Sequence, residues 1–179
     1  YVGWYYGRDH KAKIVIGKDT RRSSYMFEYA LVAGLTASGA DAYLLHVTTT
    51  PSVSYVVRTE DFDCGIMISA SHNPFYDNGI KLLNGNGQKI EAEIEARIEA
   101  YLDGRLEQLP YATGEDIGRT VDFVSGRNRY IGHLISIPSC DFKNLKVGLD
   151  CSNGSASNIA KSVFDALRAK TYVINNDPN

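Results

Sequence analysis

The sequence predicts an α/β protein: a three-layer α/β/α domain with a mixed, largely parallel sheet, followed by the start of a second, similar domain. Two observations lead to this fold class. Short runs rich in β-branched residues, typical of buried strands, alternate with segments whose apolar residues recur at helical spacing. The strand–helix–strand order of the N-terminal part also begins again near residue 146. Such alternation is typical of a parallel sheet with helices on both faces.

The N-terminal part begins with three predicted strands and two predicted helices. The strands are expected at residues 13–18, 42–46 and 62–69. Between the first two strands, apolar residues at helical spacing predict a helix with Ser23 or Ser24 as its N-cap and Gly39 as its end. A second, short helix is expected at Thr50, because Pro51 then occupies a first-turn position where its missing N–H costs nothing.

Beyond these strands, a polar loop leads into a hairpin and two further helices. In chain order we expect a hairpin of residues 79–83 and 88–90, a helix over 91–103, an irregular connection over 104–119 and a helix over 122–137. The apolar face of the helix over 91–103 comprises Ile94, Ile98, Tyr101 and Leu102, with acidic residues opposite. The hairpin adds an antiparallel element to the expected sheet.

The C-terminal part repeats this opening order. A strand is expected at residues 146–150, then a polar loop and an amphipathic helix, and a further strand at residues 172–174. We expect these two strands to form a second sheet with its own core. The predicted domains are therefore residues 1–138 and residues 139–179, the second of which is only begun.

Composition and charge argue against several classes of protein. The hydrophobic fraction is 44% and the charged fraction 22%, as in ordinary soluble globular proteins. A net charge of −2 with no basic run gives no indication of nucleic acid or an anionic membrane as partner. No apolar stretch approaches the roughly 20 residues that span a bilayer. Cys64, Cys140 and Cys151 are odd in number and lack CxxC spacing, which favours reduced thiols and a cytoplasmic protein.

Small and polar residues follow the third predicted strand at once. Residues 65–81 are GIMISASHNPFYDNGIK, so an apolar strand delivers Ser71, His72 and Asn73 into a tight loop. Turn-forming residues close this loop before the apolar pattern resumes at Ile80. A strand that ends in such a loop is a usual way to hold reactive groups on a rigid support. Composition alone is equally compatible with a turn that has no chemistry.

The loop resembles that of a known family. Residues 69–74, Ser-Ala-Ser-His-Asn-Pro, followed by Asp-Asn-Gly-Ile-Lys at residues 77–81, are similar to the active-site serine loop of the α-D-phosphohexomutases. Supporting matches are Gly-Lys-Asp-Thr-Arg at residues 17–21 and Leu-Asp-Cys-Ser-Asn-Gly at residues 149–154. Within the family, the resemblance is to bacterial members that act on glucosamine phosphate.

The resemblance implies an enzyme built from several similar α/β domains. Its substrate would be a hexosamine phosphate, with glucosamine 6-phosphate and glucosamine 1-phosphate interconverted through a phosphoserine enzyme and a sugar bisphosphate. The cofactor would be Mg²⁺, and Ser71 would carry the phosphoryl group and offer a phosphate oxygen to the metal. His72 and Lys81 would assist proton transfer or steady the phosphoryl group, and Arg21 would bind phosphate.

Elementary chemistry agrees with a phosphoryl carrier at Ser71. Adjacent side chains on an extended segment point apart, so we expect His72 to be poorly placed as its base. A hydrolase would also lack its Gly-x-Ser-x-Gly elbow. The planar fork of Arg21, where the first strand meets its helix, suits phosphate, and a surface ion pair is the alternative. Asn73 and Asp77 are expected to be turn formers.

The chain departs from the family pattern in three places. It has no Thr-Asp-Gly-Ile-Arg-Gly-like segment and no Asp-Gly-Asp-x-Asp-Arg metal loop, and it lacks the sugar-binding and phosphate-binding loops that lie later in the family. We therefore expect a fragment, inactive alone, whose other metal ligands lie outside it. Two alternatives stay open: the same chemistry on mannose or glucose phosphate, and a non-catalytic module that binds a sugar phosphate.

Overall fold

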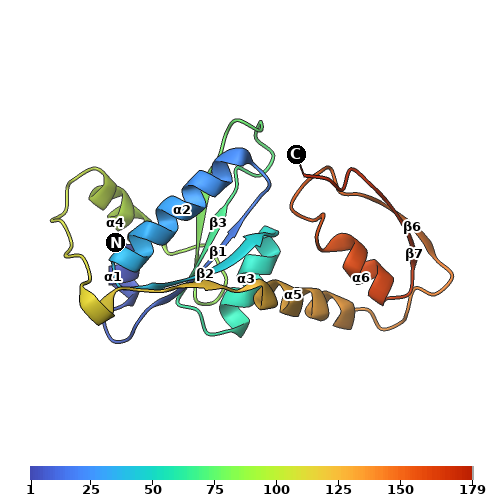
Figure 1. Ribbon diagram of the computed structural model, residues 1–179, viewed down its shortest axis with the longest axis horizontal. Coiled ribbons are helices and arrows are strands. Elements are labelled where there is room, and N and C mark those ends of the chain that lie inside the picture. Colours follow the sequence, from blue (N-terminus) through green and yellow to red (C-terminus); the bar gives the residue numbers. More distant parts are fainter. Residues whose placement is uncertain (179) are drawn as a thin grey trace.

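The computed structural model describes residues 1–178, which form two separate β-sheets joined through a helix (Figure 1). The larger sheet contains β1 (Lys13–Lys18), β2 (Asp41–Val47), β3 (Cys64–Ile68), β4 (Ile80–Asn84) and β5 (Thr120–Asp122). Its helices are α1 (Val2–Tyr6), α2 (Arg22–Ala37), α3 (Thr50–Thr59), α4 (Ala92–Leu102) and α5 (Val124–Ser136), with a short 3₁₀ turn at Gly114–Asp116. The smaller unit contains β6 (Lys146–Asp150), α6 (Ala160–Ala166) and β7 (Lys170–Ile174).

The larger sheet has the order β4-β3-β1-β2-β5, which confirms the mixed, largely parallel sheet that the sequence predicted. β1 runs parallel to both β2 and β3, while β4 pairs with β3 in the antiparallel sense. Parallel neighbours bring their carboxyl ends to the same edge, and that edge carries the polar loops after β1 and β3.

Helices cover both faces of this sheet, so its central strands are buried on both sides. Ile14 and Ile16 of β1 belong to the apolar cluster on the α1 and α2 face, whereas Val15 belongs to the cluster under α3. This division follows from the alternation of side chains along a strand. It explains why the sequence shows a continuous apolar run here instead of an alternating pattern.

Three details of this unit differ from the sequence expectations. β5 was not expected and lies between the irregular connection predicted over 104–119 and the helix predicted over 122–137; a strand of three residues is too short to give a periodic signal. The N-cap of α2 is Arg21, not Ser23 or Ser24, because the Ser24 hydroxyl donates instead to the Asp19 carboxylate. Leu102 is 78% exposed although it was expected on the buried face, since α4 is buried only in its first turn, at Ile94.

The smaller unit consists of the parallel pair β6 and β7 with α6. A second sheet with strands at residues 146–150 and 172–174 was expected here, and the pairing of β6 with β7 confirms it. Figure 1 shows α5 extending from the larger sheet to this unit, and α5 contacts α3 and β2 on one side and α6 on the other. Ile159, Val163 and Leu167 pack against α5 residues such as Leu134. The domain boundary at residues 138/139 stays a prediction.

None of the helices within residues 1–178 is both long and apolar enough to cross a membrane.

Candidate active site at the serine loop

The serine loop, defined here as residues 69–79, connects β3 to β4 at the carboxyl edge of the larger sheet. Its base is fixed by the backbone: the Ser69 N–H donates to the Gly79 carbonyl at 2.8 Å, and the Asp19 N–H donates to the Ile68 carbonyl at 3.0 Å. Ser69 is buried, and its hydroxyl accepts from the Ser71 N–H at 3.1 Å. Ser71 itself is exposed. The loop therefore grows from a rigid base and presents Ser71 to solvent.

The turn residues of the loop bond to one another and to the start of α2. Asn73 donates from its side chain to the Asp77 carboxylate at 3.3 Å, as expected for residues that form the turn. The side-chain amide of Asn78 donates to the hydroxyls of Ser23 and Ser24 at 2.9 and 3.0 Å. These two serines, expected as helix caps, thus connect the serine loop to α2.

Arg21 makes the largest set of contacts with the serine loop. A guanidinium group has five N–H donors, and all five are engaged within the chain. The acceptors are the carboxylate of Asp19 and the backbone carbonyls of Ser71, Asn73, Pro74 and Asp77, at 2.8, 3.1, 3.0, 2.5 and 3.0 Å. The phosphate-binding role predicted for Arg21 would require the side chain to release one of these bonds.

His72 lies closer to Ser71 than the sequence argument allowed. That argument assumed an extended backbone, but Ser71 has φ of 56°, in the left-handed region. The bend brings Nδ1 of His72 to 3.2 Å from the Ser71 Oγ, so the expectation that the two side chains point apart is wrong. A base that serves a hydrolytic nucleophile is in turn oriented by a third group. Among residues 1–178 no hydrogen bond reaches Nε2 of His72.

A cavity of about 330 Å³ opens beside Ser71. Its lining comprises Asp19, Thr20, Arg21, Ser69, Ser71, Asn73, Phe75, Gly154 and Ser155. Gly154 and Ser155 belong to the loop after β6, and sequence reasoning did not single them out as site residues. The repeated strand-to-polar-loop order at Asp19 and Asp150 was a signal that could have found them. Lys81 lies outside the lining described, at the exposed start of β4.

The residues around Ser71 do not by themselves form a site for a divalent cation. Within residues 1–178 no three His, Cys, Asp or Glu side chains lie together as metal ligands would. Asp19, the carboxylate that lines the cavity, accepts hydrogen bonds on both oxygens, from Arg21 and from Ser24. A metal bound here would need ligands other than these side chains.

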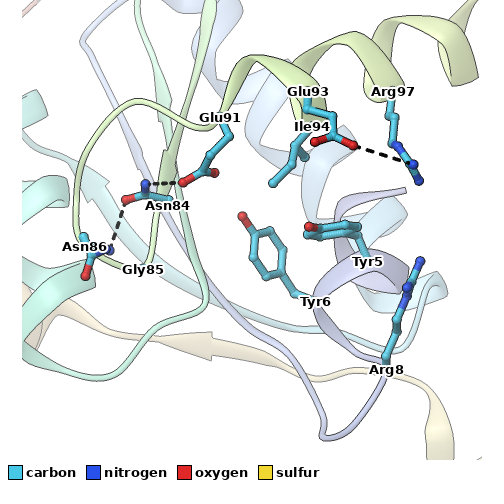
Figure 2. A pocket seen from close by; sticks show the side chains of 10 residues that line it. All are labelled: Tyr5, Tyr6, Arg8, Asn84, Gly85, Asn86, Glu91, Glu93, Ile94 and Arg97. Carbon is cyan, nitrogen blue, oxygen red and sulfur yellow. Dashed lines mark hydrogen bonds and ion pairs between the residues drawn. The ribbon is translucent and has the colours of Figure 1, made fainter.

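A larger cavity of about 570 Å³ lies elsewhere, between α1, α4 and the turn after β4 (Figure 2). Four of its polar side chains pair with one another: Asn84 donates to the Glu91 carboxylate at 2.7 Å, and Arg97 pairs with Glu93. Burial raises the pKa of the Tyr6 phenol well above its usual value. None of the unpaired buried side-chain atoms in the described part of the chain lines this cavity. The serine loop is therefore the stronger candidate site.

The comparisons with known proteins agree with the resemblance of the serine loop. A family model for phosphoglucomutase/phosphomannomutase, alpha/beta/alpha domain I, matches residues 2–108. Over its full length the chain is 70% identical to a phosphoglucosamine mutase of Lachnoclostridium phytofermentans and 71% identical to one of Lachnospira eligens. The chain spans 40% of the length of each of these relatives.

Two solved structures share the fold, each at 24% sequence identity. A phosphoglucomutase/phosphomannomutase family protein of Burkholderia thailandensis matches 94% of this chain and 36% of its own, with a TM-score of 0.73. A candidate phosphomannomutase of Thermus thermophilus matches 99% of this chain and 40% of its own, with a TM-score of 0.76. Because the family model matches more than half of the residues, the chain belongs to the phosphoglucomutase/phosphomannomutase family.

Proposed function

We propose that this chain is the N-terminal, serine-carrying part of a phosphoglucosamine mutase that interconverts glucosamine 6-phosphate and glucosamine 1-phosphate. The single observation behind this proposal is the exposure of Ser71 on a loop fixed at the carboxyl edge of the sheet. Relatives about 70% identical over the whole chain are phosphoglucosamine mutases, which favours the hexosamine substrate. The reduced thiols inferred for the three cysteines agree with the cytoplasm as its location.

In the proposed cycle, a phosphoryl group on the Ser71 Oγ passes to a free hydroxyl of the sugar phosphate. Ser71 is then a free hydroxyl and the sugar a bisphosphate. The other phosphate of the bisphosphate passes back to Ser71, which releases the isomeric monophosphate. One proton moves from the sugar hydroxyl to the Ser71 Oγ in the first transfer and returns in the second.

The 3.2 Å separation between His72 Nδ1 and the Ser71 Oγ supports a role for His72 in carrying this proton. At this position a protonated imidazole of His72 would also stabilise a phosphate on Ser71, because it donates to phosphate oxygens. Lys81 is proposed to approach the phosphoryl group from β4, although it does not line the cavity beside Ser71. Its contribution then depends on a movement of its long, exposed side chain.

Residues 139–179 are proposed to begin the second domain of this enzyme. Mg²⁺, when bound, would offset the negative charge on the transferring phosphoryl group. In this chain the phosphate of Ser71 would supply a ligand oxygen, and the remaining ligands would come from outside the sequence. The 179-residue chain alone would therefore have no mutase activity.

The test is a mutase assay on the full-length protein that contains this chain, with Mg²⁺ and a trace of glucosamine 1,6-bisphosphate. Ser71→Ala should lower kcat by about three orders of magnitude or more, because the phosphoryl carrier is lost. Ser139→Ala, which changes an exposed serine outside the cavity, should leave the rate unchanged. Normal turnover by Ser71→Ala would refute the proposal. Faster turnover of mannose 6-phosphate or glucose 6-phosphate would refute the proposed substrate, and binding of a sugar phosphate without turnover would favour the non-catalytic module.

A further inference from the structure

The outer part of the serine loop has little packing of its own. Phe75 and Tyr76 are 84% and 73% exposed, so the loop does not bury an apolar anchor in the core. Its internal backbone bonds are those of two tight turns, from Asn73 to the Ala70 carbonyl and from Asp77 to the Pro74 carbonyl. Ser71 also holds a left-handed backbone conformation, which a serine adopts at a cost. Something outside the loop must therefore fix its shape.

Arg21 is the group in the structure that meets this need. Four of its N–H bonds go to backbone carbonyls spread over seven residues, from Ser71 to Asp77, so the loop winds around one planar guanidinium. The fifth goes to Asp19, which is itself buried and accepts a bond from the Ser24 hydroxyl at 2.7 Å. The Arg21 side chain is 10% exposed, which limits competition from water.

We propose that Arg21 is a positioning residue, which holds the serine loop in the shape that presents Ser71, and that it does so through the fork geometry of its guanidinium. This inference rests on the phosphoryl-carrier role proposed for Ser71. It differs from a phosphate-binding role in what it requires of the side chain. A phosphate ligand needs a positive charge with free donors, whereas the four loop carbonyls and the Asp19 carboxylate together need five donors in one plane.

A lysine at position 21 separates these two roles. Lysine keeps the positive charge and binds phosphate as a point charge, but it has three donors and no planar fork. Arg21→Lys should therefore fail to hold the loop, as should Arg21→Gln. The neighbouring Arg22 is the exposed first residue of α2, so Arg22→Lys and Arg22→Gln are matched controls.

The first experiment measures the order of the loop by limited chymotrypsin digestion of the full-length protein. Cleavage after Phe75 and Tyr76 should rise about tenfold or more in both Arg21 variants, because proteolysis follows the population of the open loop and several bonds to a charged donor are lost. Cleavage after Tyr111, which is 81% exposed in an irregular segment away from the loop, is an internal reference that should not change. Equal cleavage after Phe75 and Tyr76 in wild-type protein and Arg21→Lys overturns the proposal.

The second experiment is a kinetic comparison of the same variants in the mutase assay. A positioning role predicts a kcat at least about tenfold lower in Arg21→Lys, with the KM for the sugar phosphate within about twofold of wild type, because the loss falls on transition-state alignment. Rescue of kcat by lysine, or a raised KM with unchanged kcat, would assign Arg21 to phosphate binding instead.

If the Arg21 variants do not fold, Asp19→Asn tests the same anchor and should raise loop cleavage equally. Unchanged cleavage after Phe75 and Tyr76 in Asp19→Asn would refute the proposal. Absence of mutase activity in wild-type protein would refute the proposed function but not the loop-holding role, which the digestion measures separately.

Discussion

Replacement of Lys18 by methionine should remove much of the stability of the larger sheet. Lys18, the last residue of β1, is 2% exposed, and its Nζ lies 2.5 Å from the carboxylate of Glu28, which is 1% exposed. Lys18→Met leaves that carboxylate buried without its partner; His46, at 3.5 Å from the other carboxylate oxygen, does not replace a direct bond. Breaking a buried pair from one side costs about 3–5 kcal/mol. This is a large share of a typical total stability of about 5–15 kcal/mol.

Urea unfolding, followed through the single tryptophan Trp4, measures this loss. With a slope of about 2 kcal/mol per molar urea, a loss of about 4 kcal/mol lowers the midpoint by about 2 M. Lys13→Met, at the half-buried start of the same strand, is the matched control and should cost less than about 1 kcal/mol. The double variant Lys18→Met/Glu28→Leu should recover most of the stability, because it leaves no buried charge. A midpoint for Lys18→Met within about 0.5 M of wild type, or a double variant as unstable as the single one, would refute this reasoning.

Three further outcomes are expected. In the native protein at pH 8, a thiol reagent should modify the exposed Cys140 while Cys64 stays unreacted, because burial raises the pKa of the Cys64 thiol to about 12; similar rates at both thiols would contradict this. Gly65→Ala should lower the stability by about 1–3 kcal/mol in urea unfolding, since the added Cβ would lie 2.4 Å from a valine methyl of α3; an unchanged midpoint would show that α3 yields freely. Bonds from the Asn175 side chain and the Ser152 N–H lower the pKa of Asp150 in the folded protein. The ionised Asp150 therefore stabilises the fold at pH values above the pKa that this residue has in the unfolded chain, and this stabilisation is lost as the pH falls through its pKa in the folded protein. NMR titration should then find a higher Asp150 pKa in Asn175→Ala, and an unchanged pKa would rule out the side-chain bond as its main cause.

The parts of the fold that the sequence predicted are those with strong local patterns. β1 and β3 are buried on both faces, so their apolar runs are continuous and easily recognised. The serine loop was found because its polar residues directly follow such a strand and because residues 69–74 and 77–81 resemble the active-site serine loop of the α-D-phosphohexomutases. Asn73 and Asp77 have short polar side chains that favour turns, and the structure confirms them as turn residues.

The features that could not be predicted leave no clear signal in the residue types. The four loop carbonyls bound by Arg21 are backbone groups, which leave no trace in residue types. The left-handed backbone at Ser71 has no glycine or asparagine to indicate it, so the His72 contact was missed. Ser24 would have capped α2 on local grounds, but Asp19 captures its hydroxyl.

The most direct test of the central claim is the position of the phosphate in the active full-length enzyme. Intact-mass analysis followed by peptide sequencing should find one phosphate per chain, on the peptide that contains residues 69–74 and localised to Ser71. Ser69 is 7% exposed and its hydroxyl accepts from the Ser71 N–H, whereas Ser71 is exposed beside the cavity, so the account predicts phosphate at Ser71 alone. Incubation with the sugar monophosphate should remove this phosphate, and the bisphosphate should restore it. A phosphate on Ser69, or full activity in protein whose Ser71 never carries phosphate, would contradict the account.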